Sequence, residues 1–161
     1  MSDKIRDLVA LVIAVIVPLL AGGIGALATA PSIPTWYAQL NKPAWNPPDW
    51  LFGPAWTVLY VVMGVAAWLV WRSGWRLPGV RVALALFAAQ LVFNVLWSII
   101  FFGLRSPGTA LAEIAVLWVL VLATTVQFFR VNTTAGALMA LYLLWVSFAT
   151  VLNAAVWSLN R

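Results

Sequence analysis

The sequence WYAQLNKPAWNPPDWLFGPAWTVLY occupies residues 36–60 and differs from the long, apolar, helix-like sequence on either side of it. It holds four of the 11 Trp and four of the nine Pro in the chain. Each Pro lacks a backbone N–H and disfavours helical geometry in the residue before it, so we expect an irregular loop at residues 40–53. The aromatic side chains of this loop need an apolar surface to cover. The stretch therefore predicts a lid, residues 31–53, folded over one end of a helical bundle.

The composition is that of an all-α integral membrane protein with a single domain. Hydrophobic residues make up 65% of the 161 residues and charged residues only 8%, against about 25% charged in soluble domains. The absence of Cys and His excludes disulfides, thiolate chemistry and imidazole metal sites. The net charge of +5 comes from scattered basic residues. This charge suits membrane orientation and contact with the lipid bilayer, and it predicts no nucleic-acid partner.

Five apolar runs are long enough to cross a bilayer, which takes about 20 residues at 1.5 Å each. The expected spans are residues 8–28, 54–71, 82–102, 109–129 and 135–159. Pro54 suits the first turn of the second span. The first run lacks a clear cleavage site at signal-peptide length, so we expect it to be retained as a span.

Small and aromatic residues mark particular positions on the first two spans. Gly22, Gly23 and Gly25 would allow another helix or a ligand to approach the backbone closely, and plain helix packing is the favoured interpretation. Trp68, Trp71 and Trp75 cluster with nearby Arg residues at the far end of the second span, which is typical of an interfacial aromatic belt.

A polar stripe marks the third span. Gln90, Asn94, Trp97 and Ser98 are spaced so that they share one helical face. An amide inside a membrane must be paired, so this face must meet protein, water or ligand. Hydrogen bonding between helices and ligand binding both remain open for these residues.

The fourth and fifth spans also carry polar or aromatic side chains inside the membrane. Glu113 lies about one turn inside the fourth span, and we expect it to pair with Arg105 near the surface. Tyr142, Trp145, Ala149 and Asn153 share one face of the fifth span by the same helical spacing.

The basic residues set an expected orientation. With five spans the termini lie on opposite sides of the membrane. The side of the N-terminus carries six Lys or Arg residues and the side of the lid and C-terminus carries three. The positive-inside rule therefore predicts an N-terminus inside and a C-terminus outside.

The sequence lacks the signatures of transporters and of acid–base enzymes. It has no inverted repeat and no mid-membrane charge pair, and a nucleophile beside a base is not visible. A pocket with aromatic walls and a few amides suits a flat apolar ligand.

Several motifs in order resemble the translocator protein family, also called TspO, tryptophan-rich sensory protein or peripheral benzodiazepine receptor. The lid carries WY-x-x-L-x-KP-x-W-x-PP-x-W followed by P-x-W-x-x-LY-x-x-MG. VP-x-L-x-GG precedes it, and Q-L-x-x-N-x-x-W-x-x-x-FFG and Y-L-x-W-x-x-FATVLN follow on the third and fifth spans. The resemblance covers essentially the whole chain.

The resemblance implies a five-helix bundle, usually a homodimer, with a cavity toward the lid that binds porphyrins and benzodiazepine-type drugs. Family cavity residues match Tyr37, Pro47, Trp56, Asn94, Trp97 and Trp145. Gln90, Tyr142, Ala149 and Asn153 are further candidates because they share faces with these residues. We also expect the Tyr37 hydroxyl to reach inward, and Trp45 and Trp50 to hold the shape of the lid.

Two departures from the family pattern affect the expected ligands. The animal cholesterol motif is broken, because Ala154 stands where the motif needs Tyr and Ser158 stands in its basic position. Cholesterol is therefore not expected as a dedicated ligand. Thr109 replaces a cavity Trp of animal members, which predicts lower drug affinity.

The expected function is that of a receptor or sensor in the bacterial cell membrane, with protoporphyrin or haem as ligand and no resident cofactor or metal. Transport or sequestration of the tetrapyrrole falls within this expectation. The alternative is an enzyme that degrades protoporphyrin under light. The resemblance implicates Trp56 and Trp145 in that activity, and the chain has no other expected catalytic residues.

Overall fold

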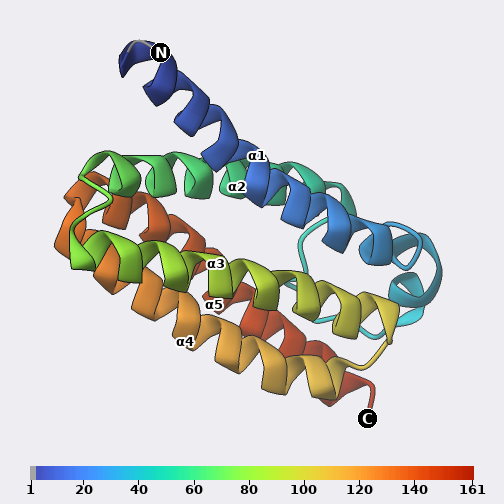
Figure 1. Cartoon of the computed structure of the whole chain (residues 1–161). Helices are drawn as coiled ribbons and strands as arrows, with labels where there is room; N and C mark the ends of the chain where they lie inside the picture. The colour runs from blue at the N-terminus through green and yellow to red at the C-terminus, as the bar shows by residue number, and fades with distance from the viewer. Residues whose placement is uncertain (1–2) are drawn as a thin grey trace.

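The computed structural model describes residues 3–161, which form five long helices and no strand (Figure 1). The helices are α1 (Asp3–Thr29), α2 (Asp49–Arg72), α3 (Pro78–Ser98), α4 (Pro107–Val131) and α5 (Thr133–Leu159). Two single turns of π-helix, η1 (Ile33–Tyr37) and η2 (Ile99–Gly103), follow α1 and α3. The prediction of an all-α bundle with five helices that could each span a membrane is confirmed.

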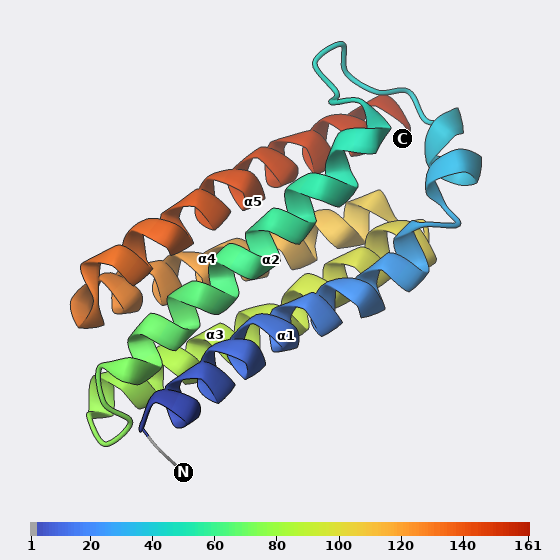
Figure 2. The same cartoon turned by 90° about the horizontal axis from the view of Figure 1, so that it is seen from above.

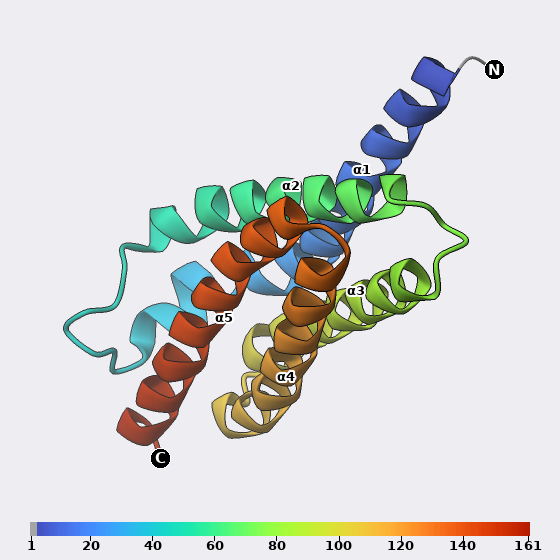
Figure 3. The same cartoon turned by 90° about the vertical axis from the view of Figure 1, so that its left-hand side faces the viewer.

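The five helices close into a ring in the order α1, α2, α5, α4, α3. α1 packs on α2 and α3, α5 packs on α2 and α4, and α3 packs on α4. Figure 3 shows α4 and α5 side by side, joined by a short turn. Asn132 forms that turn, and its Oδ1 accepts a hydrogen bond of 3.0 Å from the Ala135 backbone N–H. The N- and C-termini lie at opposite ends of the bundle, with the lid at the C-terminal end (Figure 1).

α1 is the most exposed helix of the bundle. Among its described residues only Pro18 and Gly25 are buried. Large apolar side chains such as Leu8, Leu20 and Leu27 lie exposed along its outer face. An exposed face of this length and composition suits lipid rather than water.

A glycine fixes where α1 and α2 touch. A Cβ added to Gly64 would lie 2.5 Å from the backbone O of Ala14, so no larger residue fits here without moving a helix. Toward the lid the two helices diverge (Figure 2). The helices α1 and α2 are therefore closely packed near Gly64 and lie further apart at the lid end of the bundle.

The two π-turns tie the lid end of α1 to the end of α3. In η2 the Leu104 N–H donates to the Ile99 backbone O over 2.8 Å, and in η1 the Tyr37 N–H donates to the Ser32 backbone O, also over 2.8 Å. The Ser32 hydroxyl in turn donates to the Phe102 backbone O at 2.8 Å. Such wide turns often occur at functional sites.

The start of α2 differs from the prediction. The helix begins at Asp49, so Pro54 lies inside it and not in its first turn, and residues 49–53 are helical where an irregular loop was expected. Pro48 takes an extended ψ of 140° before the helix, and Asp49 supplies an acidic residue in the first turn. At this position Pro54 has no N–H to donate to the backbone O of the residue four before it, and its ring crowds that carbonyl.

Candidate functional site

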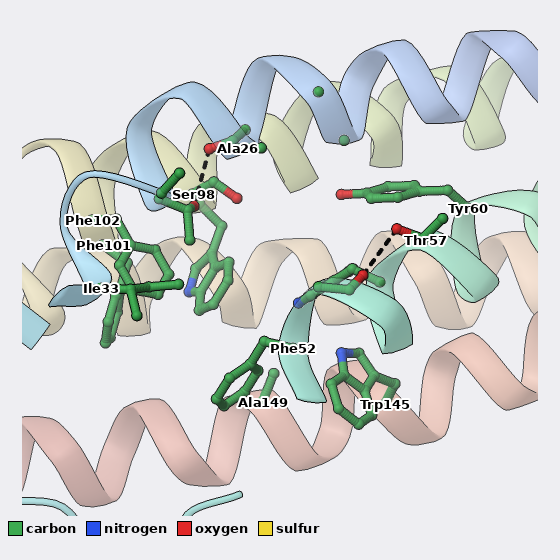
Figure 4. A pocket seen from close by; sticks show the side chains of 18 of the residues that line it. Ala26, Ile33, Phe52, Thr57, Tyr60, Ser98, Phe101, Phe102, Trp145 and Ala149 are labelled. Atoms are coloured by element: carbon green, nitrogen blue, oxygen red, sulfur yellow. Dashed lines mark hydrogen bonds between the residues drawn. The ribbon is translucent and has the colours of Figure 1, made fainter. Parts of the chain in front are cut away.

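A cavity of about 430 Å³ lies under the lid, between the diverging ends of α1 and α2. Its walls come from every long helix except α4, together with both π-turns (Figure 4). The lining is mainly aromatic and aliphatic. Its aromatic members are Tyr37, Phe52, Trp56, Tyr60, Trp97, Phe101, Phe102, Trp145 and Phe148.

Trp56 is the central aromatic side chain of this cavity. Its ring stacks on Tyr60 at a centroid distance of 5.7 Å and meets Trp145 edge-on at 6.1 Å with ring planes inclined by 88°. The ring centroid of Trp97 lies 6.4 Å from that of Trp56. Each of these aromatic contacts contributes about 0.5–1.5 kcal/mol beyond the area it buries. Trp56 therefore joins α2 to α3 and α5 across the cavity.

Asn94 lies beneath the floor of the cavity. The Tyr60 hydroxyl donates to Asn94 Oδ1 over 2.6 Å, and Asn94 Nδ2 donates to the Tyr142 hydroxyl over 2.8 Å. The three residues belong to α2, α3 and α5 and are all buried. Asn94 thus forms hydrogen bonds between helices, which is one of the two alternatives that the sequence left open. Asn94 does not line the cavity.

The Trp97 indole and the Asn153 amide are hydrogen-bonded to each other in the cavity wall. Trp97 Nε1 donates to Asn153 Oδ1 at 3.0 Å, and Asn153 Nδ2 donates to the Pro107 backbone O at 2.8 Å. These bonds fix the Trp97 ring and the start of α4 in place. Both side chains line the cavity with their main polar atoms already paired.

Trp145 differs from its neighbours in one respect. Its indole Nε1 is buried and has no hydrogen-bond partner within residues 3–161. Trp68, Trp97 and Trp118 each donate through the same atom to another residue. A buried donor without an acceptor is costly, so the Trp145 N–H would gain a hydrogen bond if a ligand brought an acceptor within its reach.

The glycines of α1 have two distinct roles. A Cβ on Gly22 would clash with the Tyr60 ring, and one on Gly25 would lie 3.0 Å from the Ser98 hydroxyl, so both serve close packing as expected. Gly23 lines the cavity, and a Cβ there would meet nothing within 4 Å. Gly23 therefore leaves open space in the cavity wall.

Hydrogen bonds hold the lid closed. Asn160, just past α5, accepts from the Asn41 backbone N–H and donates to the Asn41 backbone O, each over 2.9 Å. Lys42 Nζ donates to the Tyr37 backbone O at 2.7 Å and lies 4.7 Å from the Tyr37 ring centroid. The lid is thus attached both to the bundle and to its own first turn.

The expectation for the Tyr37 hydroxyl was wrong. The Tyr37 ring lines the cavity, but its hydroxyl donates to Asn46 Oδ1 in the lid at 2.9 Å. The reason is local: Asn46 sits between the prolines of the lid and turns its amide back toward η1. Burial, followed by the charge of Asp49, raises the pKa of Tyr37 to about 12, and the hydrogen bond to Asn46 partly offsets these effects.

Trp45 and Trp50, two of the three lid tryptophans, behave differently from one another. The Trp45 ring meets Phe148 of α5 edge-on at 5.9 Å. Trp50 is largely exposed at the start of α2, as an aromatic side chain anchored at a membrane interface would be. Of these two, Trp45 is therefore the indole that packs on the bundle.

The ten candidate ligand residues fall into two groups. The structure brings six of them to the cavity: Tyr37, Trp56, Trp97, Trp145, Ala149 and Asn153. The other four do not line it: Pro47, Gln90, Asn94 and Tyr142. Asn94 and Tyr142 lie beneath the cavity, and the Gln90 amide contacts Met63 Sδ at 3.8 Å deeper in the bundle.

Sequence reasoning missed several lining residues. Tyr60 lies four residues after Trp56, so a helical-face argument on the second span would have found it. Phe52 lies four residues before Trp56, but in the stretch that was expected to be a loop and is the first turn of α2. Phe101 and Phe102 both line the cavity because η2 is a π-turn, which no periodicity of an ordinary helix predicts.

The expected pair of Glu113 with Arg105 is also wrong. Both Glu113 carboxylate oxygens are buried without a hydrogen-bond partner in the described part of the chain. Arg105 lies exposed in the turn before α4, where its φ of 54° belongs to the left-handed region. Glu113 lies well within α4, beyond that turn, and contributes nothing to the cavity.

The cavity is lined mainly by apolar and aromatic side chains. Among residues 3–161 no group of His, Cys, Asp or Glu could hold a metal ion. The cavity lining contains no charged side chain. Stacking surfaces and few N–H donors, among them that of Trp145, suit a flat, mainly apolar molecule with a hydrogen-bond acceptor.

Comparison with known proteins gives a consistent result. The TspO/MBR family matches residues 14–158. A tryptophan-rich protein TspO from Chlorobaculum tepidum is 44% identical over 142 residues, which cover 88% of this chain and 90% of that protein. A tryptophan-rich sensory protein from Cereibacter sphaeroides is 49% identical over 125 residues, covering 78% and 77%. The human translocator protein is 42% identical over 127 residues, covering 78% and 75%.

Replacing Asn94 tests its role in the floor. Asn94→Leu removes both interhelical hydrogen bonds, each contributing about 0.6 kcal/mol in a membrane, and leaves two Tyr hydroxyls short of a partner. We expect a lower melting temperature in nanodiscs and unchanged protoporphyrin affinity. Thr150→Val is the control, because the Thr150 hydroxyl bonds only within its own helix and Thr150 does not line the cavity. Lost affinity at an unchanged melting temperature would assign Asn94 to the ligand instead.

Replacing Tyr37 tests the lid. Tyr37→Phe keeps the ring in the cavity wall and removes the bond to Asn46, so limited proteolysis of residues 40–48 should become faster. Because the pKa is raised in the closed form, the hydroxyl contributes stability below about pH 10 that is lost as the pH rises through about 12. Hydrogen exchange measures lid opening. In the parent protein lid opening should increase over this pH range, and in the Phe variant this pH-dependent increase should be absent. Identical pH profiles would contradict this role.

Proposed function

The chain belongs to the TspO/MBR family, and on that premise we propose that it is a membrane receptor that binds tetrapyrroles and similar flat apolar molecules in the cavity under its lid. The observation that carries the proposal is the aromatic cavity with a buried, unpaired donor, Trp145 Nε1. The names of two relatives, tryptophan-rich sensory protein and translocator protein, support sensing or movement of a ligand.

The cavity geometry supports a planar ligand. Trp56 of α2 and Trp97 of α3 have ring planes only 34° apart, so both offer a face to one flat molecule. The ring centroid of Phe101 lies 5.4 Å from that of Trp97, and Phe101 extends this surface toward the lid. Trp145 stands nearly perpendicular to Trp56. A carbonyl or carboxylate on the rim of a macrocycle would then accept from the Trp145 N–H.

We infer the membrane placement from charge and topology. The protein is a multi-pass integral membrane protein. The excess of basic residues on the N-terminal side supports an N-terminus inside the cell and a lid that faces outward. With this orientation the cavity opens toward the outer leaflet of a bacterial cell membrane.

A binding measurement with a matched indole control tests the proposal. Protoporphyrin is titrated in the dark into protein in nanodiscs, and heat is measured by calorimetry. Trp145→Phe keeps an aromatic ring and deletes only the N–H donor, so affinity should fall by about fivefold, as expected for loss of a bond of about 1 kcal/mol. Trp75→Phe should change nothing, because Trp75 lies in the loop after α2, far from the cavity.

Two results would count against this function. A titration in which the heat does not saturate in the parent protein would remove the receptor proposal. Equal affinities in the parent protein and in Trp145→Phe would remove Trp145 as the donor.

Contact between Trp56 and Trp145 also favours a second activity, electron donation from indole to a photo-excited porphyrin. Illuminating the same complexes in air separates the two: binding alone leaves the porphyrin absorbance as it is in free porphyrin under the same light.

A further inference from the structure

A second, shallow hollow lies on the outer surface of the bundle, between α2 and α5. We call it the α2–α5 groove. Its floor and rims include Pro54, Ala55 and Val58 of α2 and Leu141 and Leu144 of α5. Val58 is 61% exposed and Leu144 is 68% exposed. Its entire lining is apolar, and it lies within two membrane-spanning helices, so lipid chains and molecules dissolved among them can reach it.

Two side chains line both this groove and the inner cavity. Trp145 and Phe148 face the cavity on one side and the groove on the other. On the opposite rim α2 presents Pro54, Ala55, Val58 and Leu59, none of which is aromatic. A single layer of aromatic side chains therefore separates the cavity from the bilayer.

We propose that the α2–α5 groove is a lateral port through which flat apolar ligands dissolved in the bilayer enter the cavity, with Trp145 and Phe148 as its gate. The inference rests on the proposed function, because it concerns the route to the same cavity. It adds the source of the ligand, which is the membrane and not the water above the lid.

The contacts of Trp145 allow it to act as a gate. Its packing consists of ring contacts, with Trp56 at 6.1 Å, Phe148 at 5.6 Å and Phe52 at 6.5 Å. Its N–H has no acceptor among the described residues, so turning the ring breaks no hydrogen bond. Trp97, by contrast, is fixed by its bond to Asn153. Of these two cavity indoles, Trp145 is the one free to swing.

The lid braces the other half of the gate. The Trp45 ring packs edge-on against Phe148 at 5.9 Å, although 49% of Trp45 is exposed. Movement of the lid would withdraw this support and leave Phe148 free to change its side-chain rotamer. The lid therefore controls a side entrance to the cavity as well as covering its end.

A single cysteine in the groove tests the port. The chain has no Cys, so Val58→Cys places one thiol in the groove, outside the cavity lining. Rates of protoporphyrin binding from lipid vesicles are measured by Trp quenching, before and after reaction with a bulky maleimide. We expect association and dissociation to slow several-fold together, with the dissociation constant unchanged. Comparing one sample before and after modification removes any effect of the mutation on folding.

Val119→Cys is the matched control. Val119 is 58% exposed on α4 and lies in neither the cavity nor the groove lining. The same modification there should leave both rates unchanged. Unchanged rates in fully modified Val58→Cys would overturn the port while leaving the receptor intact. Absence of saturable binding in unmodified protein would overturn the receptor and the port together.

The lid contact gives an independent check. Trp45→Ala should speed ligand exchange because it releases Phe148. If exchange passes through the port, modification of Val58→Cys in the same chain abolishes this acceleration. If the acceleration survives modification, the ligand leaves past the lid into water and the port is wrong.

Discussion

The hydrogen bonds of Asn94 hold three helices together in a part of the molecule where no water can replace them. Tyr60, Asn94 and Tyr142 form one chain across α2, α3 and α5. In hydrocarbon an unpaired amide is costly, so these groups select one relative placement of the helices. On one side of this chain the bundle is close-packed around Met63, Val80 and Val121, all fully buried. On the other side it is hollow.

The hollow half depends on aromatic side chains to keep its walls apart. Large rings from three of the five long helices and from both π-turns meet there only through contacts of about 5–6 Å between centroids. Such walls leave a space with flat faces and few polar atoms. The polar atoms that are present are mostly paired within the protein, as in the Trp97–Asn153 bond. Shape and stacking therefore decide what binds, and the Trp145 N–H adds one directional contact.

The proline-rich lid completes the site. Its backbone is held by the Asn41–Asn160 bonds and by Lys42, and its Trp45 touches α5 beside the cavity. The same segment thus covers the open end and contacts the thin aromatic wall toward the bilayer. A lid that moves as one piece would alter both boundaries of the cavity at once.

The sequence predicted much of this fold because a membrane leaves few choices. Long apolar runs had to be helices, and shared helical faces brought Trp97, Trp145, Ala149 and Asn153 to the cavity. Helical periodicity gives the face of a residue but not its depth. Gln90 and Asn94 share the face of Trp97, yet they lie below the cavity where the helices are close.

Other failures of prediction came from local geometry. Asp49 starts α2 early and carries Pro54 into the helix interior. The π-turn η2 directs both Phe101 and Phe102 to the cavity. Glu113 lies deeper along α4 than a surface pair with Arg105 would require. None of these positions follows from composition or from an ideal helical repeat.

The central claim is that a flat apolar ligand occupies the cavity between the Asn94 floor and the lid. Hydrogen–deuterium exchange of the protein in nanodiscs, with and without protoporphyrin in the dark, tests it directly. The account predicts slower exchange in the lid turn at residues 33–41 and around residues 52–60 and 145–153, with no change in the loop at residues 73–77. Protection confined to that opposite loop, or spread evenly along the exposed face of α1, would contradict it.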